Sequence, residues 1–206
     1  MRFGHQYRCD GAKDDSDDSN NKVLTVETID NHVYFYSEVN SDRCLDLMKQ
    51  LRDVDGMLRR ERLTRSIPHG YPDIPIWLHM HSYGGDLFAA FAVADQIVLF
   101  NTPIFSIVEG ISASAASIIS IACKKRYITP MAHVLIHQFS SFVWGTHEEF
   151  RDEMVLQQSL MNKLISFYDT HTRMGRNEIT EALKRNTWLS ADQCLALGIA
   201  DELWRG

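Results

Sequence analysis

Hydrophobic residues recur along the chain in short runs typical of strands and in longer stripes typical of helices. Strand-like runs occupy residues 23–26, 33–36, 76–80, 104–108, 126–128 and 134–136. Apolar side chains return every three or four positions over residues 41–60, 86–100, 115–123 and 146 to about 172. Because strands and helices alternate along most of the chain, the pattern predicts an α/β fold with a largely parallel sheet.

Polar residues mark where several of these elements begin. Thr146 and Glu149 stand three positions apart before the longest stripe, and Ser190 and Gln193 repeat the arrangement before a short final helix. In a capping box each of the two side chains satisfies a free backbone amide of the other residue, so both positions predict a helix start. We also expect a turn over 110–114, where small residues follow a strand-like run.

The first 22 residues differ from the rest of the chain. Aspartate, serine and asparagine fill the stretch from Asp14 to Asn21, and apolar side chains are few. Such a stretch cannot bury enough apolar surface to offset the entropy lost on ordering, and it lacks the glycine and final glutamate of a calcium-binding loop. We therefore predict a disordered acidic tail over residues 1–22 and a single domain over residues 23–206.

Composition narrows the classes of function. The formal net charge is -6, which argues against a nucleic-acid-binding surface. The four cysteines form no CxxC pair, so neither a disulfide framework nor a zinc site is indicated. The sequence shows neither an apolar run of about 20 residues nor an apolar signal segment. We expect a soluble, cytoplasmic protein that does not bind a membrane and needs no metal or cofactor.

Small residues surround Ser114, which lies between a predicted strand and a predicted helix. Gly110 and the alanines that flank Ser114 let the backbone turn sharply and approach a substrate closely. The free amides and the dipole of a helix N-terminus favour developing negative charge, so a serine there suits a nucleophile beside an oxyanion hole. Alanine and serine also permit close helix packing, so this stretch by itself leaves both interpretations open.

Two further features bear on this chemistry. His137 ends a strand-like run, where a base is able to take a serine proton and return it to a leaving amine, although a structural histidine would look the same. The pair Gly84-Gly85 follows a buried strand, and its amides suit an oxyanion or an extended peptide as well as an ordinary turn. His79 and His81 would share one strand face, and without a third ligand we favour packing over metal binding.

In their order along the chain, these motifs resemble the proteolytic subunit of the Clp protease, ClpP, within the ClpP/crotonase fold. The similarity runs from about Val33 to Trp204. It rests on a glycine pair after a strand, a glycine four positions before the serine, a basic segment with a proline, the histidine motif and three C-terminal motifs. In this sequence they are Ser82-Tyr83-Gly84-Gly85, Gly110-Ile111-Ser112-Ala113-Ser114, 124–130, 135–138, 170–172, 188–191 and 197–201.

The resemblance implies repeated β-β-α units, a protruding handle helix from residue 146 to about 172, and serine peptidase activity. It implies Ser114 as the nucleophile and His137 as the general base. The other implied site residues are Gly85 and Ala115 for the oxyanion hole and Gly84, Phe139 and Ser140 for substrate binding. It also implies heptamer-like double rings of the same chain and a Clp-family unfoldase ATPase that feeds unfolded proteins to them. ATP would be used by that partner.

Asn186 stands where the family has the aspartate of its catalytic triad, if the chain continues without a gap from His171. An asparagine carbonyl still accepts the imidazole N–H, but it carries no charge to stabilise the imidazolium. Three interpretations follow: Asn186 orients the histidine, Glu181 or Asp192 replaces it, or the chain is a weakly active subunit of a mixed ring. We favour the first, because a dead subunit has little reason to keep the serine and histidine motifs.

Other functions share part of this pattern. A crotonase-type acyl-CoA enzyme has the same fold and oxyanion amides but needs no serine–histidine pair. A Ser/Lys peptidase requires a lysine beside the nucleophile, and no motif brings Lys124, Lys125 or Lys163 there. A structural or inactive ring subunit would assemble without hydrolysing peptides. The alanines after Ser114 are most similar to Clp-type peptidases of phages and prophages, which suggests a viral or prophage-like variant.

Overall fold

The computed structural model describes residues 26–65, 74–140 and 144–206. The predicted acidic tail lies outside these residues, as does the predicted strand over 23–26 apart from Val26. Val26 itself is buried but belongs to no strand. The first strand described is the short β1 (Glu27–Ile29), which follows directly.

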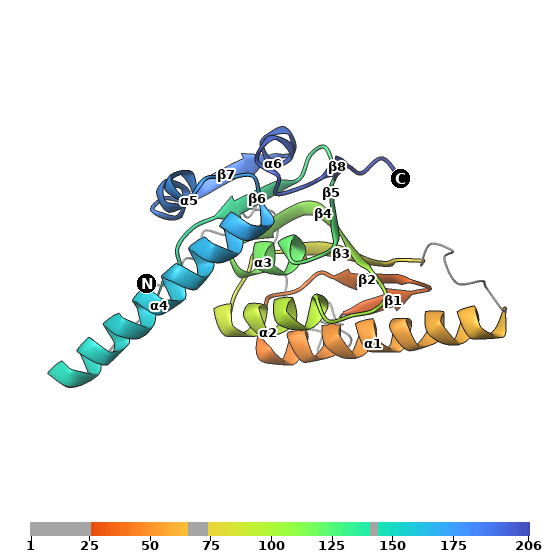
Figure 1. The fold of residues 1–206 in the computed structure, drawn as a ribbon, viewed down its shortest axis with the longest axis horizontal. Coiled ribbons are helices and arrows are strands. Elements are labelled where there is room, and N and C mark those ends of the chain that lie inside the picture. The colour runs from red at the N-terminus through yellow and green to blue at the C-terminus, as the bar shows by residue number, and fades with distance from the viewer. Residues whose placement is uncertain (1–25, 66–73, 141–143) are drawn as a thin grey trace, which may run out of the picture.

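A mixed sheet forms the centre of the described residues (Figure 1). Its other strands are β2 (His32–Phe35), β3 (Ile76–Ser82), β4 (Ile104–Ala113), β5 (Lys125–Ile128), β6 (His133–Ile136), β7 (Thr187–Ser190) and β8 (Glu202–Leu203). The strand order is β1-β2-β3-β4-β5-β8, and all pairs from β2 onward are parallel. The later half of β4 pairs in parallel with β6, which pairs antiparallel with β7. The predicted α/β class and the parallel centre are thus confirmed.

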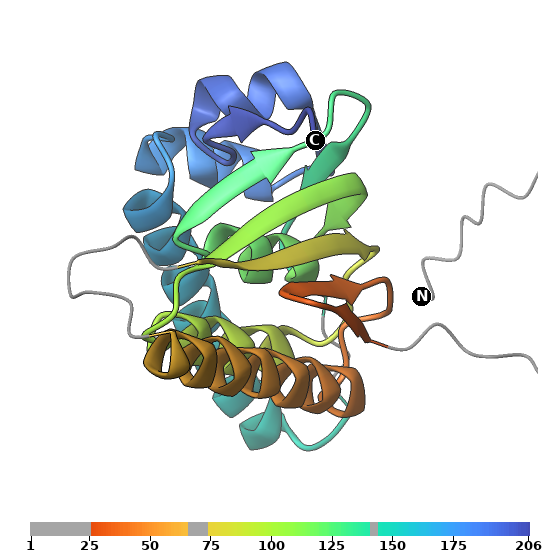
Figure 2. The ribbon, with the colours of Figure 1, turned by 90° about the vertical axis from the view of Figure 1, so that its right-hand side faces the viewer.

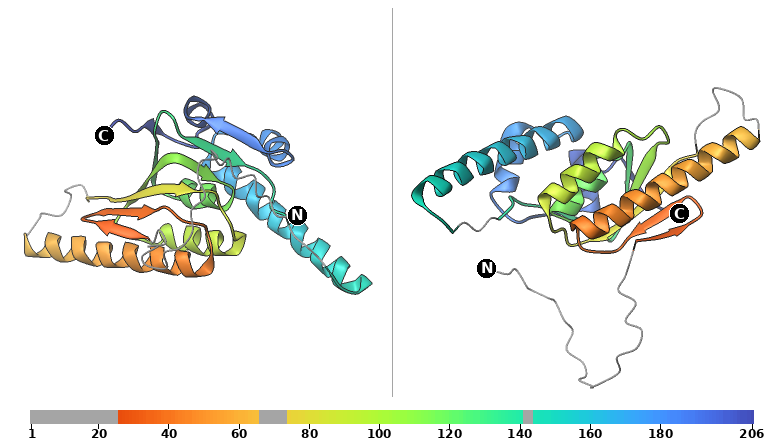
Figure 3. Two further views of the ribbon diagram at one scale, coloured as in Figure 1. Left: turned by 180° about the vertical axis from the view of Figure 1, so that it is seen from behind. Right: turned by 90° about the horizontal axis from the view of Figure 1, so that it is seen from below.

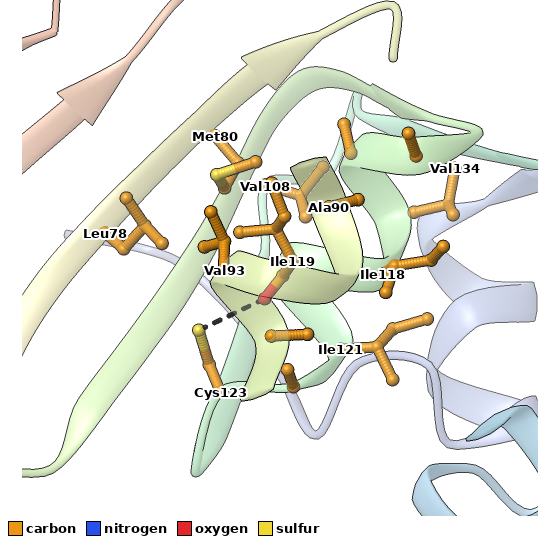
Figure 4. Close-up of a cluster of buried hydrophobic side chains, with 14 of the residues drawn as sticks. Leu78, Met80, Ala90, Val93, Val108, Ile118, Ile119, Ile121, Cys123 and Val134 are labelled. Carbon is orange, nitrogen blue, oxygen red and sulfur yellow. Dashed lines mark hydrogen bonds between the residues drawn. The ribbon is translucent and has the colours of Figure 1, made fainter. Parts of the chain in front are cut away.

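Three helices cover one face of this sheet. They are α1 (Ser41–Thr64), α2 (Leu87–Ile97) and α3 (Ala115–Ile121). Figure 4 shows the resulting core, where Leu78 and Met80 of β3 meet Val93 of α2 and Ile119 of α3. All seven residues of α3 are buried, so the helix that follows Ser114 is held from several sides. Burial of this kind keeps a short helix in place, because seven residues are too few to form a stable helix alone.

The remaining helices are α4 (His147–His171), α5 (Arg176–Leu183) and α6 (Ala191–Leu197). Figure 2 shows the strands fanned across the body, with α1 on one side and the α5–α6 region on the other. Helix α4 extends beyond the body in both views of Figure 3. Its buried side chains, Leu160, Leu164 and Tyr168, all lie in its second half. The first half of α4 is therefore the protruding part, as expected of a handle.

Both predicted capping boxes are confirmed. The hydroxyl of Thr146 accepts from the amide of Glu149, whose carboxylate accepts from the Thr146 amide, and Ser190 and Gln193 do the same at the start of α6. The hydrogen bonds from the Thr146 amide and hydroxyl hold the pKa of Glu149 below its usual value. Helix α4 consequently begins one residue after Thr146.

The predicted turn over 110–114 is wrong in extent. Strand β4 continues through Gly110, which has φ +72, as far as Ala113, and only Ser114 makes the turn. Pairing of Ile111, Ser112 and Ala113 with β6 extends the strand, and that long-range contact leaves no periodic signal in the local sequence. The short strands β7 and β8 were not predicted for the same reason, and the eight-residue helix α5 was also not predicted.

Candidate active site

Ser114 occupies the sharp bend between β4 and α3. It is the N-cap of α3 and has φ 55 and ψ -124, a conformation that costs an L residue on the order of 1–3 kcal/mol. Its amide donates to the carbonyl of Leu135 on β6 at 2.8 Å, which ties the bend to the neighbouring strand. A strained serine held between a strand and a helix presents its hydroxyl at the end of the sheet, as a nucleophile elbow does.

His137 lies beside this bend because of strand pairing. Ala113 pairs with Leu135 in the parallel β4–β6 ladder, so Ser114 and His137 both follow the carboxyl ends of adjacent strands. Both side chains are half-buried. Within the described residues neither Ser114 Oγ nor the His137 ring forms a hydrogen bond, and such contacts are often long before a substrate binds.

Asn186 immediately precedes β7, which pairs antiparallel with β6. Ile136 and Thr187 are the last pair of the ladder, so His137 follows β6 and Asn186 precedes β7 at the same end. The two segments stay connected beyond the ladder, since the amide of Gln138 donates to the Leu183 carbonyl at 2.8 Å. The Asn186 side chain is exposed to solvent.

The two carboxylates considered as substitutes lie elsewhere. Ser190 pairs with His133, so Asp192 follows the end of the β6–β7 ladder that is remote from His137. Glu181 is on α5, where it contacts the Lys184 ammonium at 2.5 Å, and that hydrogen bond holds the pKa of Glu181 below its usual value. Of the candidate orienting groups, Asn186 is the one that directly adjoins the His137 end of the β6–β7 ladder.

The glycine pair after β3 runs directly against the bend at Ser114. A Cβ on Gly84, whose φ is +93, would lie 2.6 Å from the Ala113 carbonyl oxygen and 2.8 Å from Ser114 Cβ. Gly85 is held by a bridge to Val39, whose carbonyl accepts from the Asp86 amide at 2.7 Å. Neither position has room for a side chain, so glycine is required for this close approach.

Three more residues are expected to contact the oxyanion or the substrate. Ala115 begins α3, and its amide is among the first amides of the helix, which have no partner within the helix. Phe139 is half-buried and Ser140 is exposed, and both follow His137 along the chain. The structure therefore brings Ser114, His137, Gly84 and Ala115 to one end of the sheet, with the segment 139–140 leading away from it.

Comparison with known proteins identifies the family of the chain. A family model described as Clp protease matches residues 29–206. The chain belongs to the Clp protease family. ATP-dependent Clp protease proteolytic subunit 1 of Chlamydia abortus is 29% identical over 184 residues, covering 87% of this chain and 89% of that protein. Subunit 1 of Protochlamydia amoebophila is 30% identical over 136 residues, covering 64% of this chain and 66% of that protein.

A solved Clp protease structure shares the fold. A ClpP1 mutant from Listeria monocytogenes, with an asparagine replaced by aspartate, superposes with a TM-score of 0.72 and 22% identity over 85% of this chain and 92% of that one. The predicted ClpP-like fold is confirmed. Family membership also identifies the chain as a Clp protease proteolytic subunit of the serine peptidase class and favours that class over the acyl-CoA alternative.

The histidines on β3 of this Clp protease subunit have structural partners. His79 Nδ1 lies 2.9 Å from Glu109 Oε1, and its Nε2 lies 2.9 Å from His32 Nδ1. His81 Nδ1 lies 2.8 Å from the Glu109 carbonyl, so both rings share one strand face as predicted. Burial, followed by the proximity of His79, lowers the pKa of His32. Residues 26–65, 74–140 and 144–206 contain no group of three side chains suited to a metal ion.

Across the helices that the structure describes, none combines the length and apolar character needed to cross a bilayer.

Proposed function

We propose that this Clp protease subunit is an endopeptidase that uses Ser114 as nucleophile and His137 as general base. The observation that supports this most directly is the register of β4 and β6, which aligns Ala113 with Leu135 and so brings the two residues together. The strained conformation of Ser114 supports the same assignment, because strain of this kind is concentrated at functional sites.

The reaction follows from these positions. Ser114 Oγ attacks the peptide carbonyl carbon while His137 accepts the hydroxyl proton, and the amides of Gly85 and Ala115 bind the resulting oxyanion. The C–N bond then breaks as His137 returns the proton to the leaving amine. Water hydrolyses the acyl-enzyme by the same route, with His137 again taking a proton. Asn186 accepts the other imidazole N–H and fixes the orientation of the ring.

The substrate lies as an extended strand beside the glycine pair. Gly84 is buried against the nucleophile bend while Gly85 next to it is exposed, and Phe139 and Ser140 follow the general base along the chain. An extended peptide is able to pair with such an edge through its main chain, so binding would be tolerant of sequence. This tolerance suits unfolded polypeptides, which we propose as the substrates.

The active assembly is a heptamer-like double ring fed by a Clp-family unfoldase ATPase in the cytoplasm. The relatives are named ATP-dependent Clp protease proteolytic subunits, which supports a partner that supplies the ATPase. The protruding half of α4 supports self-association, because it exposes apolar side chains that a monomer would leave in water. These side chains are Phe150, Met154, Val155 and Leu156. The alanines after Ser114 support a phage- or prophage-like variant.

A second candidate is a weakly active or inactive subunit of a mixed ring. Two observations favour it: Asn186 is uncharged, and the relatives carry numbered names, subunit 1 and subunit 2. Such a subunit would assemble and bind the unfoldase without hydrolysing peptides itself.

A fluorophosphonate probe separates the two candidates. We expect an adduct on Ser114 in the purified, assembled protein, found by peptide mass spectrometry, and its loss in Ser114→Ala and His137→Ala. His133→Ala is the matched control, because His133 lies at the opposite end of β6 from His137, is exposed and contacts the Met131 carbonyl. An assembled protein that leaves Ser114 unmodified would contradict the peptidase proposal and support the inactive subunit.

A further inference from the structure

A buried pair of hydroxyls joins α4 to the bend that carries the proposed nucleophile. Tyr168 on α4 is 2% exposed and Ser117 on α3 is fully buried. Tyr168 Oη lies 2.9 Å from Ser117 Oγ, where α4 passes α3 (Figure 1). Ser117 Oγ in turn donates to the carbonyl oxygen of Ser114 at 2.6 Å. The three groups form one continuous chain of hydrogen bonds.

The direction of this chain follows from the number of protons. A serine hydroxyl has one proton to donate, and Ser117 gives its proton to the Ser114 carbonyl. The contact with Tyr168 must then run from the tyrosine O–H to Ser117 Oγ. Each donor in such a chain polarises the next bond, so the tyrosine strengthens the bond that Ser117 makes to Ser114. Burial raises the pKa of Tyr168 to about 12, which keeps its proton in place.

The Ser114 carbonyl is held twice. Besides the Ser117 hydroxyl, it accepts from the Ser117 amide at 3.0 Å. The carbonyl of Ser114 and the amide N–H of Ala115 belong to one planar trans peptide and point in opposite directions. Fixing the carbonyl toward Ser117 therefore aims the Ala115 N–H the other way, away from the body of α3. The strain at Ser114 makes such a restraint useful, because the unrestrained bend would relax.

We propose that Tyr168 and Ser117 are positioning residues that set the orientation of the Ala115 amide for the developing oxyanion. The proposal rests on the peptidase function proposed above, in which that amide is a donor. Buried hydroxyls commonly find partners simply to avoid being unsatisfied. Here, however, the hydroxyl and the amide of Ser117 both donate to the one peptide group that links the nucleophile to the oxyanion amide, and Tyr168 supports that hydroxyl.

The test compares kcat and KM for a fluorogenic peptide in full-length, assembled wild type, Tyr168→Phe and Ser117→Ala. Tyr168→Phe removes the hydroxyl and keeps the ring, so packing is preserved. Because the oxyanion forms after substrate binds, we expect kcat to fall by about five- to tenfold in each variant with KM unchanged. The double variant should be no slower than Ser117→Ala, since the two hydroxyls act in series.

Ser120→Ala is the matched control. Ser120 is also a buried serine on α3, and it donates to the Ser117 carbonyl at 3.0 Å rather than to the bend. We expect it to lower the melting temperature as the other variants do but to leave kcat within twofold. If Tyr168→Phe and Ser117→Ala also leave kcat within twofold, the pair is only structural and the proposal is overturned. An assembled wild type without a Ser114 adduct would instead overturn the peptidase function, and this proposal with it.

Discussion

Replacing Asn186 by aspartate adds one negative charge opposite the proposed general base. His137 follows and residue 186 precedes the last pair of the β6–β7 ladder, which is Ile136 and Thr187. The new carboxylate would therefore lie within reach of the His137 ring. The carboxylate accepts the same imidazole N–H as the amide and also attracts the imidazolium that forms during attack. Asn186→Asp should therefore accelerate acylation of Ser114.

The size of the effect depends on solvent exposure. Unit charges about 4 Å apart attract by about 1 kcal/mol in water and about 4 kcal/mol at the effective dielectric near a protein surface. Asn186 is exposed and His137 is half-buried, so we take about 2 kcal/mol, which corresponds to about a 30-fold change in rate. The chymotrypsin-type triad, whose aspartate is buried, loses about 10⁴ in the reverse exchange.

The assay is the second-order rate of fluorophosphonate labelling at Ser114, with peptide turnover measured in parallel. Asn186→Ala should label about tenfold more slowly than wild type, because the ring loses its orienting acceptor. Asn101→Asp is the charge-matched control, since Asn101 lies before the amino end of β4 and Ser114 follows the carboxyl end. Equal rates for wild type, Asn186→Asp and Asn186→Ala would refute the assignment of Asn186 as the orienting residue.

Three further predictions concern stability and reactivity. Gly84→Ala should abolish Ser114 labelling and lower the free energy of unfolding by about 2 kcal/mol or more, because the added Cβ would collide with the Ala113 carbonyl. Gly56→Ala in α1, with no contact under 3.8 Å, should instead stabilise by about 0.5–1 kcal/mol in the same denaturant titration. Burial raises the pKa of Asp201, but hydrogen bonds and charge from Arg126 outweigh it and hold that pKa below its usual value. The resulting stabilisation is complete above the unfolded pKa of about 4 and disappears as the pH falls through the folded pKa. Asp201→Asn should therefore lower the free energy of unfolding by about 1 kcal/mol at pH 7 and leave it unchanged in acid. A difference in free energy of unfolding between wild type and variant that stays constant across pH would contradict this. Burial also raises the pKa of three thiols to about 11–12, so iodoacetamide at pH 8 should modify them only after unfolding. Modification of any of these three thiols in the native protein, located by peptide mass spectrometry, would show the burial to be wrong. These are Cys44, Cys123 and Cys194.

Local patterns were sufficient for the larger elements. Runs of apolar residues predicted β3 and the helices α1, α2 and α4 within a few residues of their observed ends, and they predicted the start of β4 but not its continuation to Ala113. Capping boxes at Thr146 and Ser190 were confirmed, because their signal lies within four consecutive residues. The candidates Ser114 and His137 were visible for a similar reason, since small residues and strand ends are local features of the sequence.

The sequence by itself therefore determined the fold class and the starts of the longer helices, and through its resemblance to a family it proposed the nucleophile and the base. Only the tertiary structure decided that β4 continues to Ala113, that Asn186 rather than Asp192 adjoins the His137 end of the β6–β7 ladder, and that Tyr168 contacts Ser117. These features depend on pairs of residues far apart in the chain, 51 positions in the case of Tyr168 and Ser117. Propensity and periodicity report on neighbours within a few residues, whereas strand register and buried hydrogen bonds form when distant segments pack together.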